Sequence, residues 1–153
     1  MERFVSSFRN KVDGKGRVSV PAVFRGVLAR QGHSVLYAYP SPGAPALDCG
    51  GQRLIDEISV LLEGLPPYSD ERDLLSVELF GRCEELRVDG DGRIVLPDDL
   101  RAHAGIEGEA VMVGLGHKFQ IWEPGRFEAR RSESAKRVGE LRGLLGRETP
   151  VDR

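Results

Sequence analysis

Short apolar runs alternate with glycine- and proline-rich turns along this chain, a pattern that predicts a β-rich fold with several helices. Two such runs, Val18–Val20 and Ile94–Leu96, are typical of short strands, and each ends at a proline suited to the first position of a helix. We therefore expect helices over residues 21–30 and 97–104, with Gly105 ending the second. Further strands are expected over 34–39 and 84–88, with a β-hairpin formed by 110–113 and 119–122.

Three longer segments show helical spacing instead. Apolar residues from Leu54 to Leu65 predict a helix over 52–64 with one packed face, ended by Pro66-Pro67. Ser69 is a suitable cap for a second helix reaching about Leu79. A polar helix is expected over 124–145, and the tail 146–153 is expected to fray. The stretch 40–45 has loop composition, so the strand over 34–39 is expected to lack the hairpin partner seen in the second half.

One segment occurs twice. Val12–Arg25 aligns without gaps on Val88–Arg101, at an offset of 76 residues, half the chain. Two copies indicate a duplicated half-domain, since solenoids need three or more repeats. We divide the chain into a first half (1–52), connecting helices (53–80), a second half (81–124) and a C-terminal helix with tail (125–153). The expected fold class is α+β.

Charge is distributed unevenly, although the net charge is only −2. Residues 1–30 carry seven basic and two acidic side chains, a net +5, whereas the other 123 residues carry −7. Such a split predicts a localised anion-binding surface, to which Arg3 and Arg9 would contribute. No run has the ~18 apolar residues of a membrane helix, and two lone cysteines without a secretory signal make the cytosol the expected location.

The repeated segment centres on Asp-x-x-x-Arg, at Asp13/Arg17 and Asp89/Arg93. Asp-Gly followed by a second glycine predicts a tight turn in each copy, formed by Asp13, Gly14 and Gly16 and by Asp89, Gly90 and Gly92. The aspartates either cap these turns or take part in function, and the two interpretations are equally supported. The arginines can offer a planar fork to guanine or phosphate, and Lys15 adds a phosphate contact at the first tip.

The sequence gives little support for a metal site or a catalytic site. An EF-hand interpretation of Asp89–Arg93 fails because Ile94 and Leu100 stand where glycine and glutamate are required. His33, His103 and His117 lack metal-ligand spacing, and no nucleophile elbow or phosphate-binding glycine pattern occurs. We expect no enzyme activity, metal, cofactor or small-molecule substrate. Phe119 and Trp122 either stack on a base or, as is commoner, anchor a core.

The duplicated Asp-x-x-x-Arg motif, Lys15–Pro21, Leu100–Gly105, Val111–Gly114 and Lys118–Trp122 resemble the bacterial MraZ family over roughly residues 1–140. The resemblance implies an AbrB-like (SpoVT-type) swapped-hairpin barrel and a ring-shaped homo-oligomer. It also implies a double-stranded-DNA-binding regulator, usually a repressor, of the division and cell-wall gene cluster, located on the cytoplasmic nucleoid. The family's DNA-contacting turn carries over to Lys15, Arg17 and Arg93.

Two departures from the family pattern qualify this. Asp91 occupies the position that Lys15 has in the first turn, so the first turn is expected to dominate DNA contact. Residues 46–50 lack an aromatic, proline-containing segment common in the family, which leaves the packing of 40–52 open. The alternative function is a protein-interaction module such as an antitoxin, which the duplicated hairpin and the helical tail disfavour.

Overall fold

The computed structural model describes residues 3–32 and 35–146. In chain order the elements are β1 (Ser7–Lys11), β2 (Arg17–Ser19), α1 (Ala22–Arg30), β3 (Val35–Pro40), β4 (Leu47–Gly50), α2 (Gln52–Glu63), α3 (Asp70–Ser76), the π-helical turn η1 (Val77–Gly81), β5 (Glu84–Arg87), β6 (Arg93–Val95), α4 (Asp98–Ala104), β7 (Glu109–Gly114), β8 (Phe119–Trp122), α5 (Pro124–Leu141) and the 3-10 turn η2 (Arg142–Leu144). Among the described helices, none is long and apolar enough to cross a membrane.

Two sheets interleave the halves of the chain. The larger is antiparallel with strand order β1-β7-β8-β4-β3-β5, and the smaller is the β2–β6 pair. Exchanging the strands of one half for their counterparts in the other leaves this order unchanged, as the duplicated sequence requires. β1 and β5 form the two ends of the larger sheet, and no pairing joins them within the described residues. The α+β class is confirmed, while the closed swapped-hairpin barrel stays a prediction.

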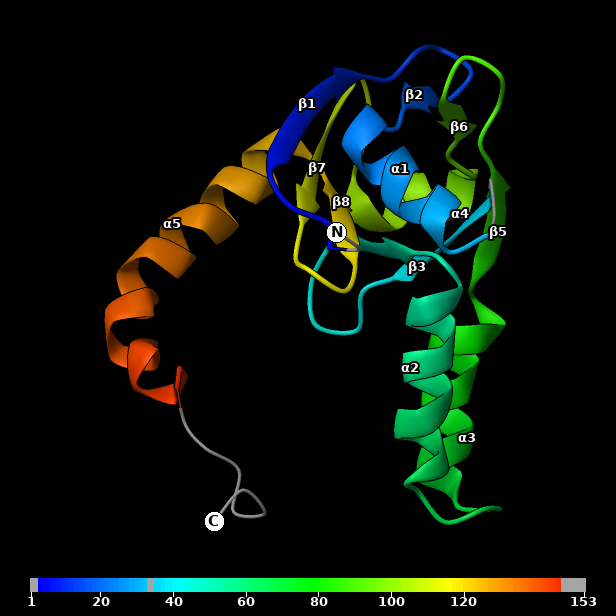
Figure 1. Cartoon of the computed structure of the whole chain (residues 1–153), viewed down its shortest axis with the longest axis vertical. Helices are drawn as coiled ribbons and strands as arrows, with labels where there is room; N and C mark the ends of the chain where they lie inside the picture. Colours follow the sequence, from blue (N-terminus) through cyan, green and yellow to red (C-terminus); the bar gives the residue numbers. More distant parts are fainter. Residues whose placement is uncertain (1–2, 33–34, 147–153) are drawn as a thin grey trace.

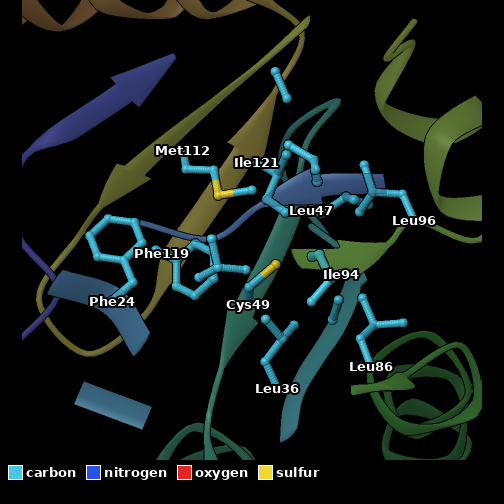
Figure 2. Close-up of a cluster of buried hydrophobic side chains, with 14 of the residues drawn as sticks. Phe24, Leu36, Leu47, Cys49, Leu86, Ile94, Leu96, Met112, Phe119 and Ile121 are labelled. Carbon is cyan, nitrogen blue, oxygen red and sulfur yellow. The ribbon is translucent and has the colours of Figure 1, made fainter. Parts of the chain in front are cut away.

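The main core lies on one face of the larger sheet, where the β2–β6 pair, α1 and α4 cover it (Figure 1). Alternate strand residues point into this core and meet the buried faces of the two helices. Figure 2 shows side chains from both halves interlocked here, including Phe24 and Phe119, whose rings lie 4.7 Å apart. Neither half therefore has a complete core of its own.

Two helical elements cover parts of the opposite face. Buried Leu54, Ile58 and Leu62 of α2 pack with Tyr39, and α2, α3 and η1 project from the body as a pair (Figure 1). At the other end, Phe127 of α5 packs near Trp122, and the remainder of α5 extends away from the sheet (Figure 1). Phe119 and Trp122 are 0% and 2% exposed, so the core interpretation of this pair is confirmed.

Most sequence-based expectations for the elements are confirmed. α1, α4, the β7–β8 hairpin and α2 appear where expected, and Ser69 caps α3 by accepting a hydrogen bond from the Arg72 amide at 3.2 Å. The beginning of the strand expected over 34–39 and most of the tail 146–153 lie outside the described residues.

One expectation is wrong. β3 does not lack a hairpin partner, because β4 pairs with it antiparallel from Tyr37↔Gly50 to Pro40↔Leu47 and also pairs with β8. β4 has only four residues, all of them buried, and two of these, Asp48 and Gly50, are of types that strands disfavour, so the sequence pattern did not indicate a strand here. Residues 41–46 thus connect the two strands of a hairpin, and the two halves match here as elsewhere.

Candidate nucleic-acid interface

The repeated turns lie at opposite ends of the β2–β6 ribbon. The central pair of this ribbon is Val18↔Ile94, both buried, with Arg17 opposite Val95 and Ser19 opposite Arg93. The neighbouring residues of each strand face outward, so the two arginines lie diagonally on one accessible face. Both turns lie at the end of the molecule away from α2 and α3 (Figure 1).

The first turn is organised by the carboxylate of Asp13. Its Oδ1 accepts hydrogen bonds from the backbone amides of Lys15 and Arg17, both at 2.9 Å. Its Oδ2 accepts from Arg17 Nε at 2.6 Å. These backbone and side-chain hydrogen bonds from Arg17, and the amide of Lys15, lower the pKa of Asp13 to about 2. The carboxylate therefore stays charged throughout the physiological range.

The second turn repeats this geometry with one addition. Asp89 Oδ1 accepts from the amides of Asp91 and Arg93 at 2.8 and 2.9 Å, and the Arg93 amide is the main cause of the lowered pKa of Asp89. Arg93 Nε donates to Asp89 at 3.3 Å, and its terminal NH2 also donates to Asp91 at 3.2 Å. The turn-capping interpretation of both aspartates is thus supported by their contacts.

Each turn is held by a backbone hydrogen bond from the other half of the chain. The amide of Leu96 donates to the carbonyl of Gly16 at 2.9 Å, and the amide of Val20 donates to that of Gly92 at 2.8 Å. Gly16 and Gly92 have φ of +81° and +78°, a region in which glycine is favoured. Gly14 and Gly90 have open space around them, so they serve the turns without a steric requirement.

A further pair of arginines lies beneath the turns. A Cβ added at Gly16 would meet Arg101 NH1 at 3.3 Å, and one added at Gly92 would meet Arg25 Nε at 2.8 Å. Arg25 and Arg101 are equivalent residues of the two repeat copies, and each supports the turn of the other copy. Sequence reasoning missed them as site residues, although their recurrence at matching positions in the repeat was a usable signal.

The arginines differ in what remains available for a ligand. Asp13 engages Nε of Arg17, whereas the terminal nitrogens of Arg17 make no hydrogen bond to another described residue. Arg93 has one terminal nitrogen occupied by Asp91. Lys15 is exposed at the tip of the first turn, where the second turn has Asp91, whose side chain is 79% exposed. The first turn is therefore more electropositive than the second.

The other two predicted basic residues lie apart from the turn tips. Arg9, in the middle of β1, makes a two-bond ion pair with Glu109 at 3.1 and 3.0 Å, which neutralises much of its charge. Arg3 precedes β1 at the end away from the Asp13 turn, next to Val5 and Val23. Lys15, Arg17 and Arg93 are thus brought together on the ribbon and its turns, and Arg3 and Arg9 are not.

No cluster of three potential metal ligands occurs within residues 3–32 and 35–146, a range that includes His103 and His117 but not His33. The remaining chemistry of the ribbon is hydrogen-bond donation from guanidinium, ammonium and backbone groups. Such donors match phosphate oxygens and the acceptor edge of guanine.

Comparisons with known proteins agree on one family. A family model described as "MraZ protein, putative antitoxin-like" matches residues 79–138. A protein of Xanthobacter autotrophicus named Transcriptional regulator MraZ is 53% identical over 146 residues, covering 95% of this chain and 93% of its own. Proteins of the same name from Methylocella silvestris and Rickettsia akari are 56% and 42% identical over 145 residues. Each alignment covers 95% of this chain, and it covers 88% and 97% of those proteins, respectively.

Proposed function

This chain belongs to the MraZ family, and on that premise we propose that it is a transcriptional regulator that binds double-stranded DNA through the β2–β6 ribbon and its two turns. The observation that carries the proposal is the diagonal placement of Arg17 and Arg93 on the accessible face of this ribbon. A two-stranded ribbon fits the major groove of B-DNA, where an arginine fork can contact O6 and N7 of guanine.

Each group has a distinct role in this proposal. Asp13 holds Nε of Arg17 and so directs the terminal nitrogens outward, which reduces the conformational entropy lost on binding. Lys15 contacts a backbone phosphate and positions the ribbon. Arg93 makes a second, weaker contact because Asp91 competes for its terminal nitrogen. Arg9 and Arg3 add at most long-range attraction, since they lie away from the turn tips.

Affinity requires several copies of this surface. One chain presents few basic side chains and carries a net charge of −2, and each neutralised phosphate contributes a log–log salt slope of only about −0.9. We propose a ring-shaped homo-oligomer, which makes later contacts intramolecular and raises avidity by roughly 10²–10⁴. The β2–β6 ribbons of neighbouring copies, bound to one face of the DNA, would recognise short boxes about one helical turn, ~10–10.5 bp, apart.

The biological target follows from the family resemblance. We propose repression at the promoter of the division and cell-wall gene cluster, with the protein on the cytoplasmic nucleoid. A footprint on the DNA upstream of this gene would show several evenly spaced protected boxes. A single continuous protected stretch would contradict the repeated-box arrangement.

The test of the interface is a comparison of two equivalent arginines. Arg17→Ala removes a bidentate base contact, and such a contact contributes about 1–3 kcal/mol, so affinity for a single box falls roughly 5- to 150-fold. Arg93→Ala has a smaller effect, because Asp91 already occupies one of its nitrogens. Fluorescence anisotropy with a labelled duplex at physiological salt measures both.

A gain-of-function variant serves as the matched control. Asp91→Lys gives the second turn the tip residue of the first and releases Arg93, so DNA affinity rises. Unchanged affinity of Arg17→Ala, with an unchanged oligomer mass, would disprove the ribbon as the DNA-binding surface.

A protein-interaction role is the second candidate, because the matching family model is described as antitoxin-like. An antitoxin would co-purify from its native host with a stoichiometric toxin that contacts a part of the chain outside the ribbon. Such a complex, combined with failure to bind upstream DNA, would replace the regulator proposal.

A further inference from the structure

Helix α5 has almost no packing partner within its own chain. It is 18 residues long, yet Phe127 in its first turns, near Trp122, is its only apolar anchor among the described residues. Every residue from Glu128 to Gly146 is exposed. In proteins, most of the stability of a helix comes from tertiary packing of an amphipathic face rather than from helix propensity. α5 therefore has a face that fits a partner.

That face is apolar and bordered by arginine. Phe127, Ala135, Val138 and Leu141 follow helical spacing along α5, and Val138 is 60% exposed. Arg131 and Arg142 lie on the same face, one turn after Phe127 and Val138, and neither makes an ion pair within the described residues.

Two of the three acidic residues of α5 lie away from this face, whereas Glu128 borders it beside Arg131 and Ala135. Glu133 and Glu140 are paired with Arg130 and Arg137 at 2.8 and 3.2 Å. α5 as a whole has five basic and three acidic residues. The side of α5 that offers apolar area thus carries Arg131 and Arg142, with Glu128 at its edge.

The complementary surface is on the projecting helices. We define the helical arm as residues 52–81, comprising α2, α3 and η1, with seven acidic and two basic side chains. Leu74 and Val77 on its outer side are 61% and 59% exposed. Acidic neighbours lie one turn away, with Asp70 and Glu78 on either side of Leu74 and Asp73 before Val77. Glu78 is paired with Arg82 at 3.2 Å, so Asp70 and Asp73 supply most of the uncompensated negative charge beside these apolar residues.

We propose that α5 of one copy packs on the helical arm of a second copy, joining its apolar, arginine-bordered face to the apolar, acid-bordered face of the arm. This inference deepens the proposed function, because it rests on the homo-oligomer proposed there and assigns its interface. Charge complementarity favours contact between α5 and the arm over contact between two like elements. Contacts between two α5 helices would oppose arginine to arginine, and contacts between two arms would oppose carboxylate to carboxylate.

The placement of the two elements makes the contact head-to-tail. α5 and the helical arm lie on opposite flanks of the body, so α5 does not reach the arm of its own chain (Figure 1). Each copy then offers one α5 and one arm, a heterologous arrangement that closes into a ring when the rotation between copies permits. Both elements project away from the turns (Figure 1), so the docked copies leave the ribbon accessible to DNA.

A charge-reversal series tests the pairing without DNA. Arg131→Glu/Arg142→Glu places glutamate against the acidic arm, and we expect the oligomer to dissociate at micromolar concentration in sedimentation velocity. Asp70→Arg/Glu78→Arg on the arm has the same effect. The four substitutions combined restore the native mass, because the two faces are again complementary. Circular dichroism before each run checks that every variant keeps the wild-type secondary structure.

The control is Lys136→Glu, which makes half the charge change of Arg131→Glu/Arg142→Glu on the opposite face of α5 and leaves the mass of the oligomer unchanged. A wild-type chain that is monomeric, reversed variants that keep the native mass, or a combined variant that stays dissociated would each overturn the proposal. Weakened DNA binding at unchanged mass in Arg131→Glu/Arg142→Glu would also overturn it, by showing that α5 contacts DNA. Loss of binding in Arg17→Ala at native mass belongs to the proposed function, so the two tests are independent.

Discussion

Single residues determine the shape of the candidate DNA-binding surface before any ligand is present. The Asp-Gly pattern was enough to predict both turns and the place of Lys15, Arg17 and Arg93. It could not show that Arg17 keeps free terminal nitrogens while Arg93 shares one with Asp91, since this depends on side-chain geometry across the turn. The roles of Arg25 and Arg101 were also hidden, because each supports a turn more than 60 residues away in sequence.

At this scale, Gly16 and Gly14 provide a matched pair of substitutions. Gly16→Ala puts a Cβ at φ +81° and 3.1 Å from the Leu96 carbonyl oxygen, so we expect the free energy of unfolding to fall by about 1–2 kcal/mol. Gly14→Ala meets no atom within 4 Å and should change it by no more than about 0.5 kcal/mol. Urea denaturation of both variants measures the difference. Equal effects would show that the turn does not require the left-handed conformation at Gly16.

Secondary-structure elements were predictable where their side chains alternate or follow helical spacing. β4 was missed because both of its faces are buried, and its one charged residue, Asp48, is only 2% exposed. Asp48 accepts hydrogen bonds from Lys118 Nζ at 3.0 Å and Gln120 Nε2 at 2.8 Å, so its charge is compensated inside the sheet. A partner 70 residues away in sequence leaves no local signal in β4 itself.

The Asp48–Lys118 ion pair lets us predict how a substitution between the paired strands β4 and β8 affects stability. Lys118→Ala leaves a buried carboxylate without its ammonium partner, and we expect a loss of about 3 kcal/mol in the free energy of unfolding. Arg9→Ala breaks a solvent-exposed pair of similar geometry with Glu109 and should leave stability nearly unchanged. Thermal unfolding of the two variants, followed by circular dichroism, makes the comparison. A loss no larger for Lys118→Ala than for Arg9→Ala would show that water solvates Asp48 in the native state.

For the whole molecule, the duplication predicted the symmetric contribution of the two halves but not the order in which their strands pair. The same symmetry is broken by charge, since Lys15 at the first tip corresponds to Asp91 at the second. The proposed oligomer would compensate by repeating the first turn around the assembly.

Salt dependence tests this arrangement. On a single-box duplex, Lys15→Ala removes one phosphate contact and should reduce the slope of log affinity against log salt by about 0.9. Lys136→Ala on α5 removes an equal charge far from the ribbon and should not change the slope. Anisotropy titrations at several salt concentrations give both slopes, and identical slopes for wild type and Lys15→Ala would place Lys15 away from DNA.

The pairing of β1 with β7, which sets Lys11 opposite Glu109, also has a consequence for synthesis of the chain. At ~5–20 residues per second, the ribosome takes roughly 5–20 s to make the intervening segment, and during that time β1 has no partner strand. The first turn likewise lacks one hydrogen bond until Leu96 has been synthesised, because the Leu96 amide donates to the Gly16 carbonyl. A nascent chain that ends before Leu96 therefore lacks this hydrogen bond to the first turn, and the two-stranded ribbon can form only after β6 has been synthesised.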